Sequence, residues 1–233
     1  GMTDLTSDVV EVTIAPATPI EILPGQFMRF AFDGFPSRAF SPTEPLNGQS
    51  IAPAFCLNIK RVRGGQVSPQ LGKAIRVGHR VRMLGPFGHA YLRSGGQDRL
   101  ILIGSGTGFA PVWAVATAAL RENPHRPMFL LGATRQIGSF YIASALELAN
   151  RFPNVTVVTA VERGEELPAP IHTGPPEAHL PEMGPRDIVY AAGSPAMVDR
   201  VAAIATEAGA TFYSDPFEAD PQRAPPLPAR LGS

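Results

Sequence analysis

The sequence is short of cysteine and carries no net charge. Cys56 is the only cysteine among 233 residues, which excludes a disulfide framework and any zinc or iron–sulfur site with four cysteine ligands in this chain. Twenty basic residues balance twenty acidic ones, so the basic excess that nucleic-acid binding requires is absent. Gly1-Met2 resembles a tag remnant and no secretion signal follows it. We therefore expect a cytoplasmic protein with no nucleic-acid partner.

Two further classes of protein find little support. The sequence has no Gly-x-Ser-x-Gly motif, and its five histidines show no metal-ligand spacing, so neither a hydrolase nor a metal site is predicted. The stretch from Leu100 to Leu120 has no charged residue and is long enough to span a bilayer. Its glycines and Pro111 would break a helix inside lipid, however. We expect a strand, a turn and a buried helix there, and no membrane contact.

The chain changes character near residue 95. Before it, short alternating runs predict strands separated by turns, and these are typical of a small antiparallel barrel or sandwich. We therefore expect a β-barrel domain over residues 1–95. The expected strands are 9–15, 27–32, 55–62 and 80–84.

After residue 95, strands and helices alternate, which predicts a doubly wound parallel sheet over residues 96–217. A Pro-rich tail over 218–233 follows, and a short helix without a definite place is expected within 162–186. Ser194 is expected to cap the last helix and Gly209 to end it. The expected strands are 100–104, 127–132, 154–161, 187–192 and 210–214, and the expected helices are 110–122, 139–151 and 195–208.

A glycine-rich turn joins the first strand of this second domain to its helix. In Gly104-Ser-Gly106-Thr-Gly108, glycines allow close approach to a ligand, and the helix start offers free N–H groups to a pyrophosphate. The spacing matches neither the P-loop nor the usual dinucleotide fingerprint. A tight turn without a ligand is the alternative.

The next strand ends at Thr134-Arg135, where an adenosine ribose would lie in such sheets. An acid there would bind a 2′-hydroxyl, whereas an arginine can pair with a 2′-phosphate. The sequence has Arg135 and no acid at this point, which favours NADPH. A solvated surface arginine is the alternative.

The first domain has three motifs of its own. Arg38-Ala-Phe40-Ser41 combines a cation for a phosphate, an aromatic ring for stacking and a hydroxyl for a ring nitrogen. Gly64-Gly-Gln-Val-Ser68 would begin a short helix and form a second anion site. Gly85-Pro-Phe-Gly88 is a turn after a strand. Each motif alone is more often structural.

Together, these motifs resemble those of the ferredoxin–NADP reductase superfamily, in particular the flavin-dependent reductases that serve bacterial oxygenases. The matches occur in family order over about residues 22–217. They are Pro24-Gly-Gln-Phe27, Arg38–Ser41, Leu57–Val62, Gly65–Ser68, Gly85–Gly88, Gly106–Pro111, Gly132–Arg135, Tyr190–Pro195 and Asp215-Pro-Phe217.

The resemblance implies a flavin-binding antiparallel barrel followed by a nicotinamide-nucleotide domain, with FAD (FMN being the alternative) and NADPH or NADH. Ser41, near the flavin N5, and Thr107, at the cleft between the rings, are the implied catalytic residues. The implied cofactor-binding residues are Arg38, Phe40, Ser41, Pro42, Asn58, Ile59, Lys60, Gly65, Gln66, Val67, Ser68, Gly106, Thr107, Gly108, Pro111, Thr134, Arg135, Gly193, Ser194, Pro195 and Phe217.

The resemblance implies an oxidoreductase that takes hydride from NAD(P)H to FAD and passes electrons to a separate acceptor, such as a ferredoxin or an oxygenase component. Two residues depart from the family pattern: Phe40 replaces a frequent Tyr, and Ala192 replaces the usual Cys. Ala192 keeps an alternative open, a non-catalytic flavin- or nucleotide-binding subunit or sensor of the same fold.

Overall fold

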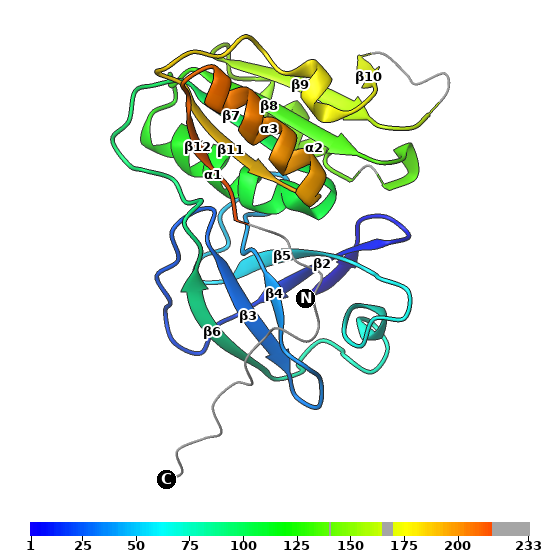
Figure 1. Cartoon of the computed structure of the whole chain (residues 1–233). Coiled ribbons are helices and arrows are strands. Elements are labelled where there is room, and N and C mark those ends of the chain that lie inside the picture. Colours follow the sequence, from blue (N-terminus) through cyan, green and yellow to red (C-terminus); the bar gives the residue numbers. More distant parts are fainter. Residues whose placement is uncertain (140, 165–169, 216–233) are drawn as a thin grey trace.

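The computed structural model describes residues 1–139, 141–164 and 170–215. Two domains lie one above the other (Figure 1). The barrel domain comprises strands β1 to β6, and the α/β domain comprises strands β7 to β12 with their helices. The two-domain architecture predicted from the sequence is confirmed.

The barrel domain is built from two three-stranded antiparallel sheets. One sheet has the order β1-β2-β5 and contains Met2–Asp4, Val9–Ile14 and Phe55–Lys60. The other has the order β4-β3-β6 and contains Arg38–Phe40, Phe27–Phe32 and Val81–Phe87. Alternate apolar side chains of both sheets fill the space between them, as strand periodicity requires. This core includes Val10, Val12, Met28, Phe30, Phe32, Leu57 and Ile59.

The opposite face of the β2–β5 pair turns toward the α/β domain. Val9 lies opposite Lys60, and Glu11 lies opposite Asn58, in the antiparallel register. Val9 belongs to the hydrophobic cluster of the α/β domain rather than to the barrel core. One strand pair thus contributes to the barrel core with one face and to the domain interface with the other.

The α/β domain has a six-stranded parallel sheet in the order β10-β9-β8-β7-β11-β12. Helices α1 and α2 pack on one face of the sheet, and α3 packs on the other. The strands are Ile171–Thr173, Val155–Val161, Met128–Thr134, Leu100–Ser105, Ile188–Ala192 and Thr211–Tyr213 in that order, and the helices are Phe109–Glu122, Ala143–Ala149 and Pro195–Glu207.

The uncharged stretch 100–120 forms β7, a 3-10 turn (η2, Gly106–Gly108) and most of α1. β7 is buried because it lies at the centre of the sheet, and α1 is buried because it packs between the sheet and the rest of the molecule. Among the residues that the structure describes, no helix has the length and apolar character needed to cross a bilayer.

Several local expectations need correction. The helix expected over 139–151 is limited to α2, with a separate 3-10 turn, η3 (Ile137–Ser139), before it. The Ser194 side chain makes no capping hydrogen bond; the first turn of α3 instead bonds to the Ser194 carbonyl. Residues 171–173 form strand β10, and the helical turn η4 is Pro176–His179. The three-residue strands β1, β4 and β10 are too short for a periodic pattern.

Candidate functional site

The strand order of the α/β sheet reverses between β7 and β11. From β7 the chain continues to β8 on one side, whereas β11 lies on the other side of β7. At such a switch point, the loops after the two strands diverge and leave a crevice, which is where open α/β sheets bind ligands. The loops here are η2 after β7, and Gly193-Ser194 after β11.

The two loops touch each other at Gly108. A Cβ atom built on Gly108 would lie 2.5 Å from the Ala192 carbonyl carbon and 2.6 Å from the Gly193 nitrogen. Real Cβ atoms essentially never approach backbone so closely. Glycine at position 108 is therefore required by the contact between the two loops.

A cavity of about 240 Å³ opens beside this contact. Both loops line it, together with the ends of β8 and β9 and two barrel residues. The structure thus brings together eight of the predicted site residues: Lys60, Gly106, Thr107, Gly108, Thr134, Arg135, Gly193 and Ser194. Five other lining residues were not predicted: Val9, Ser105, Ser139, Tyr141 and Glu162.

Two predicted residues lie beside the cavity rather than in its lining. Pro111 is buried in the first turn of α1, and Pro195 is the exposed first residue of α3. Both belong to helices that begin at the two loops. Phe217 lies outside the described residues.

An acidic residue lies beside Arg135, contrary to the expectation from sequence. Glu162 follows β9, and its carboxylate oxygen is 3.9 Å from Arg135 Nε. β8 and β9 are parallel neighbours, so their carboxyl ends share one edge of the sheet. The predicted strand 154–161 could have placed Glu162 there. Because an arginine and an acid both line the cavity at the end of this strand pair, Arg135 alone no longer favours NADPH.

Lys60 reaches the cavity from the barrel domain and pairs with Asp8. The two groups are 3.3 Å apart, and Asp8 also accepts a 3.1 Å hydrogen bond from the Ser139 hydroxyl of the α/β domain. Burial acts to raise the pKa of Asp8, but hydrogen bonds from Thr6, Lys60 and Ser139 outweigh it and lower the pKa. Asp8 therefore stays ionised at neutral pH and ties the domains together beside the cavity.

The phosphate-binding motifs predicted in the barrel domain meet each other. Arg38 Nη2 donates to Gln66 Oε1 at 3.2 Å, although the two residues are 28 positions apart. Gly65 lies in the same loop. Ser68 is buried, and its hydroxyl oxygen accepts a 3.0 Å hydrogen bond from the Val62 amide. Strand β4 and the loop before η1 (Ser68–Gln70) thus form one polar corner that contains a guanidinium.

Other predicted barrel residues divide between this corner and the core. Ser41 and Pro42 are buried directly after β4, and the Phe40 ring lies 6.0 Å from that of Phe30. Ile59 and Val67 point into the barrel core, so their side chains are unavailable to a ligand and only their backbone could contact one.

Asn58 has an unusual environment. Its side chain is 5% exposed, yet neither its amide nitrogen nor its amide oxygen has a hydrogen-bond partner among the described residues. An unpaired buried polar group costs about 1–3 kcal/mol. β5, which carries Asn58, contacts η2 of the α/β domain. This polar group at the domain interface therefore has unused capacity for a ligand.

Tyr141 of the α/β domain lines the same cavity. Its hydroxyl donates to the Gly106 carbonyl at 3.1 Å. Burial raises the pKa of Tyr141 and outweighs the neighbouring Asn58 side chain, which acts to lower it, so the phenol stays protonated and keeps this bond at physiological pH. Cys56, on the same strand face as Asn58, is buried, and burial raises the pKa of its thiol to about 12.

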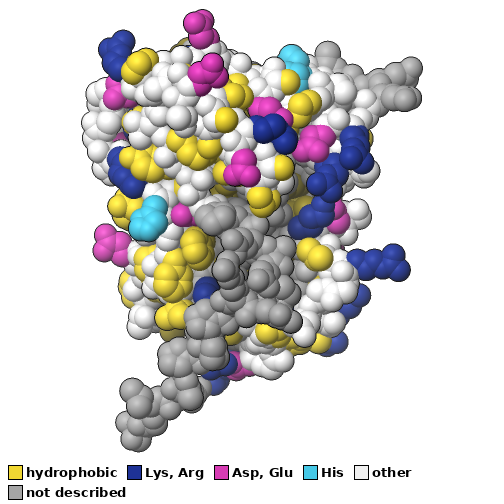
Figure 2. Space-filling view, in the orientation of Figure 1, with side chains coloured by type: hydrophobic (Ala, Val, Ile, Leu, Met, Phe, Trp, Pro, Cys, Tyr) yellow, Lys and Arg dark blue, Asp and Glu magenta, His cyan; other side chains and the backbone are white. Residues whose placement is uncertain are grey.

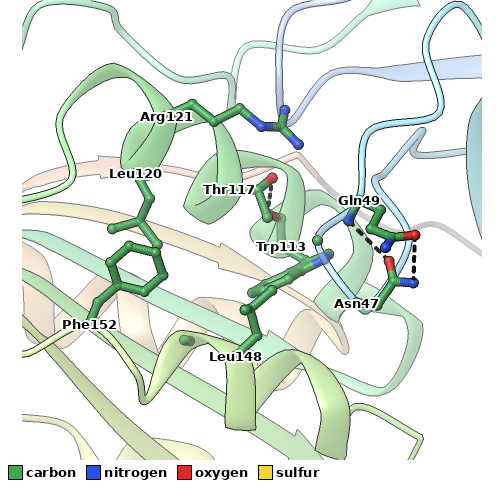
Figure 3. Close-up of a pocket in the computed structure, with 10 residues that line it drawn as sticks. Asn47, Gln49, Trp113, Thr117, Leu120, Arg121, Leu148 and Phe152 are labelled. Atoms are coloured by element: carbon green, nitrogen blue, oxygen red, sulfur yellow. Dashed lines mark hydrogen bonds between the residues drawn. The ribbon is translucent and has the colours of Figure 1, made fainter.

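A second cavity, of about 250 Å³, lies between the loop after β4 and helices α1 and α2 (Figure 3). Trp113, Leu120, Leu148 and Phe152 give it an apolar wall, and Trp113 Nε1 donates to the Pro45 carbonyl at 3.2 Å. None of the predicted site residues lines it. We assign the candidate site to the first cavity.

Comparison with known proteins finds two domain families. Residues 4–91 match the oxidoreductase FAD-binding domain, and residues 102–203 match the oxidoreductase NAD-binding domain. The two domains of the fold therefore correspond to a FAD-binding and a NAD-binding oxidoreductase domain. The chain belongs to the ferredoxin–NADP reductase superfamily, as its motifs indicated.

Relatives of known role are reductase components. The ferredoxin–NAD(P)+ reductase component of the naphthalene 1,2-dioxygenase system of Pseudomonas putida is 28% identical over 223 residues, which are 91% of this chain and 65% of that protein. The corresponding component of the naphthalene 1,2-dioxygenase/salicylate 5-hydroxylase systems of Ralstonia sp is 31% identical over 204 residues, covering 84% and 60%. The chain thus spans less than two thirds of these relatives' length.

Solved structures agree with this assignment. The ferredoxin reductase in carbazole 1,9a-dioxygenase superposes with a TM-score of 0.81 at 27% identity, covering 94% of this chain and 67% of that chain. The similarity extends over both domains, so it includes their arrangement.

Proposed function

We propose that this protein is an NAD(P)H-dependent flavoprotein reductase, which takes hydride from a nicotinamide nucleotide to FAD and passes electrons to a separate protein acceptor. One observation carries the proposal. The glycine loops of the α/β domain and the Lys60 side chain of the barrel domain open on one cavity. Transfer between two flat rings requires a nicotinamide site that opens toward the flavin domain, and this cavity lies at the domain interface.

The residues of the barrel domain fit FAD. Arg38, held against Gln66, would bind the phosphates, with the backbone of Gly65–Ser68 as further donors. The buried amide of Asn58, which has no partner among the residues that the structure describes, can both donate and accept, as the edge of a flavin ring does. Phe40 would stack on the ring and Ser41 would hydrogen-bond to it. When bound, FAD supplies the capacity to accept a hydride and release its electrons one at a time.

The residues of the α/β domain fit a nicotinamide nucleotide. The backbone N–H groups at the start of α1 would receive the pyrophosphate, aided by the partial positive charge of the helix. Thr107 and Gly193 would hold the nicotinamide ring at the barrel side, and Pro195 would fix the loop that carries Gly193. Thr134, Arg135 and Glu162 would surround the adenosine ribose. Each residue acts by position rather than as an acid or a base.

The proposed acceptor is a separate iron–sulfur protein or oxygenase component, since relatives carry names of this kind. The barrel domain supports a partner with an acidic surface. Between Glu44 and Asp98 the sequence has no acidic residue. Figure 2 shows Lys and Arg side chains down the right-hand side of this face, alongside both domains. Complementary charge would speed the encounter of the two proteins.

The direct test is anaerobic addition of NADH or NADPH to the flavin-loaded protein, followed through the visible absorption of the flavin. We expect bleaching with at least one nucleotide. If neither nucleotide bleaches the flavin, the proposal is wrong.

The alternative, a non-catalytic flavin- or nucleotide-binding subunit, is favoured by Ala192 at the end of β11, where the family usually has Cys. Steady-state reduction of ferricyanide or cytochrome c separates the two functions. The reductase turns over many acceptor molecules per flavin, whereas the non-catalytic subunit does not.

A further inference from the structure

Three motifs that contribute nothing to the cavity meet at one place outside it. They are Pro24–Phe27, Gly85–Gly88 and the described start of Asp215–Phe217. The segment after β6 joins them: the Leu92 amide donates to the Pro24 carbonyl at 2.9 Å, and the Asp215 carboxylate binds the segment directly after Gly88.

The Asp215 carboxylate holds two consecutive backbone amides. Oδ1 accepts from the His89 nitrogen at 2.9 Å, and Oδ2 accepts from the Ala90 nitrogen at 3.0 Å. A carboxylate is the side chain with two acceptor oxygens and no donor, and charge-assisted bonds of this kind are the strong ones. The two ends of the contact lie 125 and 126 residues apart. The last described residue of the α/β domain is thus bound to the segment that leaves the barrel.

Gly88 makes room for this carboxylate. It has a φ angle of +100°, and a Cβ atom built on it would lie 3.0 Å from Asp215 Cγ and closer still to Oδ2. Any other residue at position 88 would push the carboxylate away. The last glycine of the Gly-Pro-Phe-Gly motif is therefore explained by Asp215, without reference to a cofactor.

Aromatic contacts reinforce the same junction. The Arg93 guanidinium lies 3.5 Å from the centroid of the Tyr91 ring and 4.6 Å from that of Tyr213. Tyr213 stacks on Tyr190 with their centroids 5.2 Å apart, and the Tyr190 hydroxyl donates to the Tyr91 carbonyl at 2.9 Å. β11 and β12 thus both bind residues 89–93. In Figure 1, β12 runs down to the junction of the two domains.

These contacts connect both sides of the cleft. β6 belongs to the barrel sheet that includes Arg38–Phe40, and β11 ends at Ala192 beside the cavity. We infer that Asp215 is a positioning residue, a latch that fixes the α/β domain on the barrel at the separation hydride transfer needs. The inference rests on the proposed function. Reacting atoms must come within roughly 3–3.5 Å, and a displacement of about 1 Å can cost about 100-fold in rate.

The test compares Asp215→Asn with Asp187→Asn in the flavin-loaded full chain. Asp187 is a matched control because its carboxylate also accepts a backbone amide, that of Gly184, at 2.7 Å, and a 2.7 Å bond from Arg99. All of these groups lie within the α/β domain. Loss of the Asp187 contacts should lower stability without changing the domain arrangement.

We expect anaerobic flavin reduction at saturating nucleotide to slow by at least about tenfold in Asp215→Asn, with flavin content unchanged. The rate in Asp187→Asn should stay close to that of the unaltered protein. The deuterium isotope effect with 4-deuterated nucleotide should rise in Asp215→Asn alone, because hydride transfer would become the slow step. Equal slowing in both variants would show that Asp215 only stabilises the fold, and the positioning role would be wrong.

Two measurements that do not depend on activity test the role of Asp215 separately from the proposed function. Hydrogen exchange at the His89 and Ala90 amides should be faster in Asp215→Asn than in Asp187→Asn, and small-angle scattering should show a more extended particle. Unchanged exchange at both amides would overturn the latch. If the unaltered protein is not reduced by either nucleotide, the proposed function fails, and these two measurements still decide on the latch.

Discussion

The two sides of the cleft are built in different ways. On the α/β side, the loops at Gly108 and Gly193 are fixed by backbone packing so tight that a single added Cβ atom would not fit. On the barrel side, Arg38 and Gln66 hold each other through side chains, and the buried amide of Asn58 has no hydrogen-bond partner within the described part of the chain. Under the proposed function, the nicotinamide side is therefore preformed, whereas the flavin side would be completed by its ligand.

This difference matches the roles of the two ligands. A nicotinamide nucleotide must enter and leave in every catalytic cycle, so its site gains from a shape that does not have to be rebuilt. A flavin stays bound, and its site can depend on it for stability, since a ligand that binds only the folded state stabilises that state. Substitutions on the two sides should accordingly have different signatures.

The largest effect should come from Gly108→Ala. The new Cβ atom would collide with the Ala192 carbonyl and the Gly193 nitrogen, so the two loops must separate. We expect flavin reduction by the nucleotide to fall by about 100-fold, the cost of a displacement of about 1 Å at a reacting centre. Flavin content should not change, because Gly108 lies on the α/β side. Stopped-flow reduction and the absorption spectrum of the purified protein measure the two quantities.

Gly184→Ala is the matched control for this substitution. A Cβ atom built on Gly184 would meet no atom within 4 Å, so reduction should proceed as in the unaltered protein. Loss of flavin in Gly108→Ala would show that the two sides are not built independently and would break the comparison.

The sequence predicts the α/β side better than the barrel side. Long buried strands such as β7 and β8 and the glycine turn between β7 and α1 leave local signals of composition and spacing. β4 has only three residues, and its hydrogen bond from Arg38 to Gln66 joins positions that no local pattern connects. Tyr141 and Ser139 could not be predicted as site residues, because only tertiary packing brings them to the cavity. Glu162 was predictable from the edge shared by β8 and β9.

A substitution at Asn58 should act with opposite signs on two properties. Asn58→Leu replaces an unpaired buried amide by an apolar group of similar size, so the flavin-free protein should gain about 1–3 kcal/mol in free energy of unfolding. Flavin affinity should fall by about tenfold, since a hydrogen-bonding partner of the ring is lost. Denaturant unfolding and flavin titration measure the two effects.

Thr43→Val separates the two properties for Asn58. The Thr43 hydroxyl is also buried in the barrel domain without a described partner, so its removal should stabilise the flavin-free protein while leaving flavin affinity unchanged. Should Asn58→Leu destabilise the flavin-free protein, the barrel side would already be complete without its ligand, and the contrast between the two sides would disappear.

The smallest effect should come from Glu162→Gln, on the preformed side. Glu162 lies 3.9 Å from Arg135 and competes with any 2′-phosphate for that guanidinium, while its own charge repels the phosphate. Removing one unit charge at about 4 Å is worth about 1 kcal/mol in water, or about fivefold. We therefore expect the ratio of kcat/KM for NADPH to that for NADH to rise by about fivefold, with flavin affinity unchanged. Glu207→Gln, at the end of α3 and outside the cavity lining, should leave the ratio unaltered. An equal rise in both variants would assign the effect to net charge rather than to a ribose site between Arg135 and Glu162.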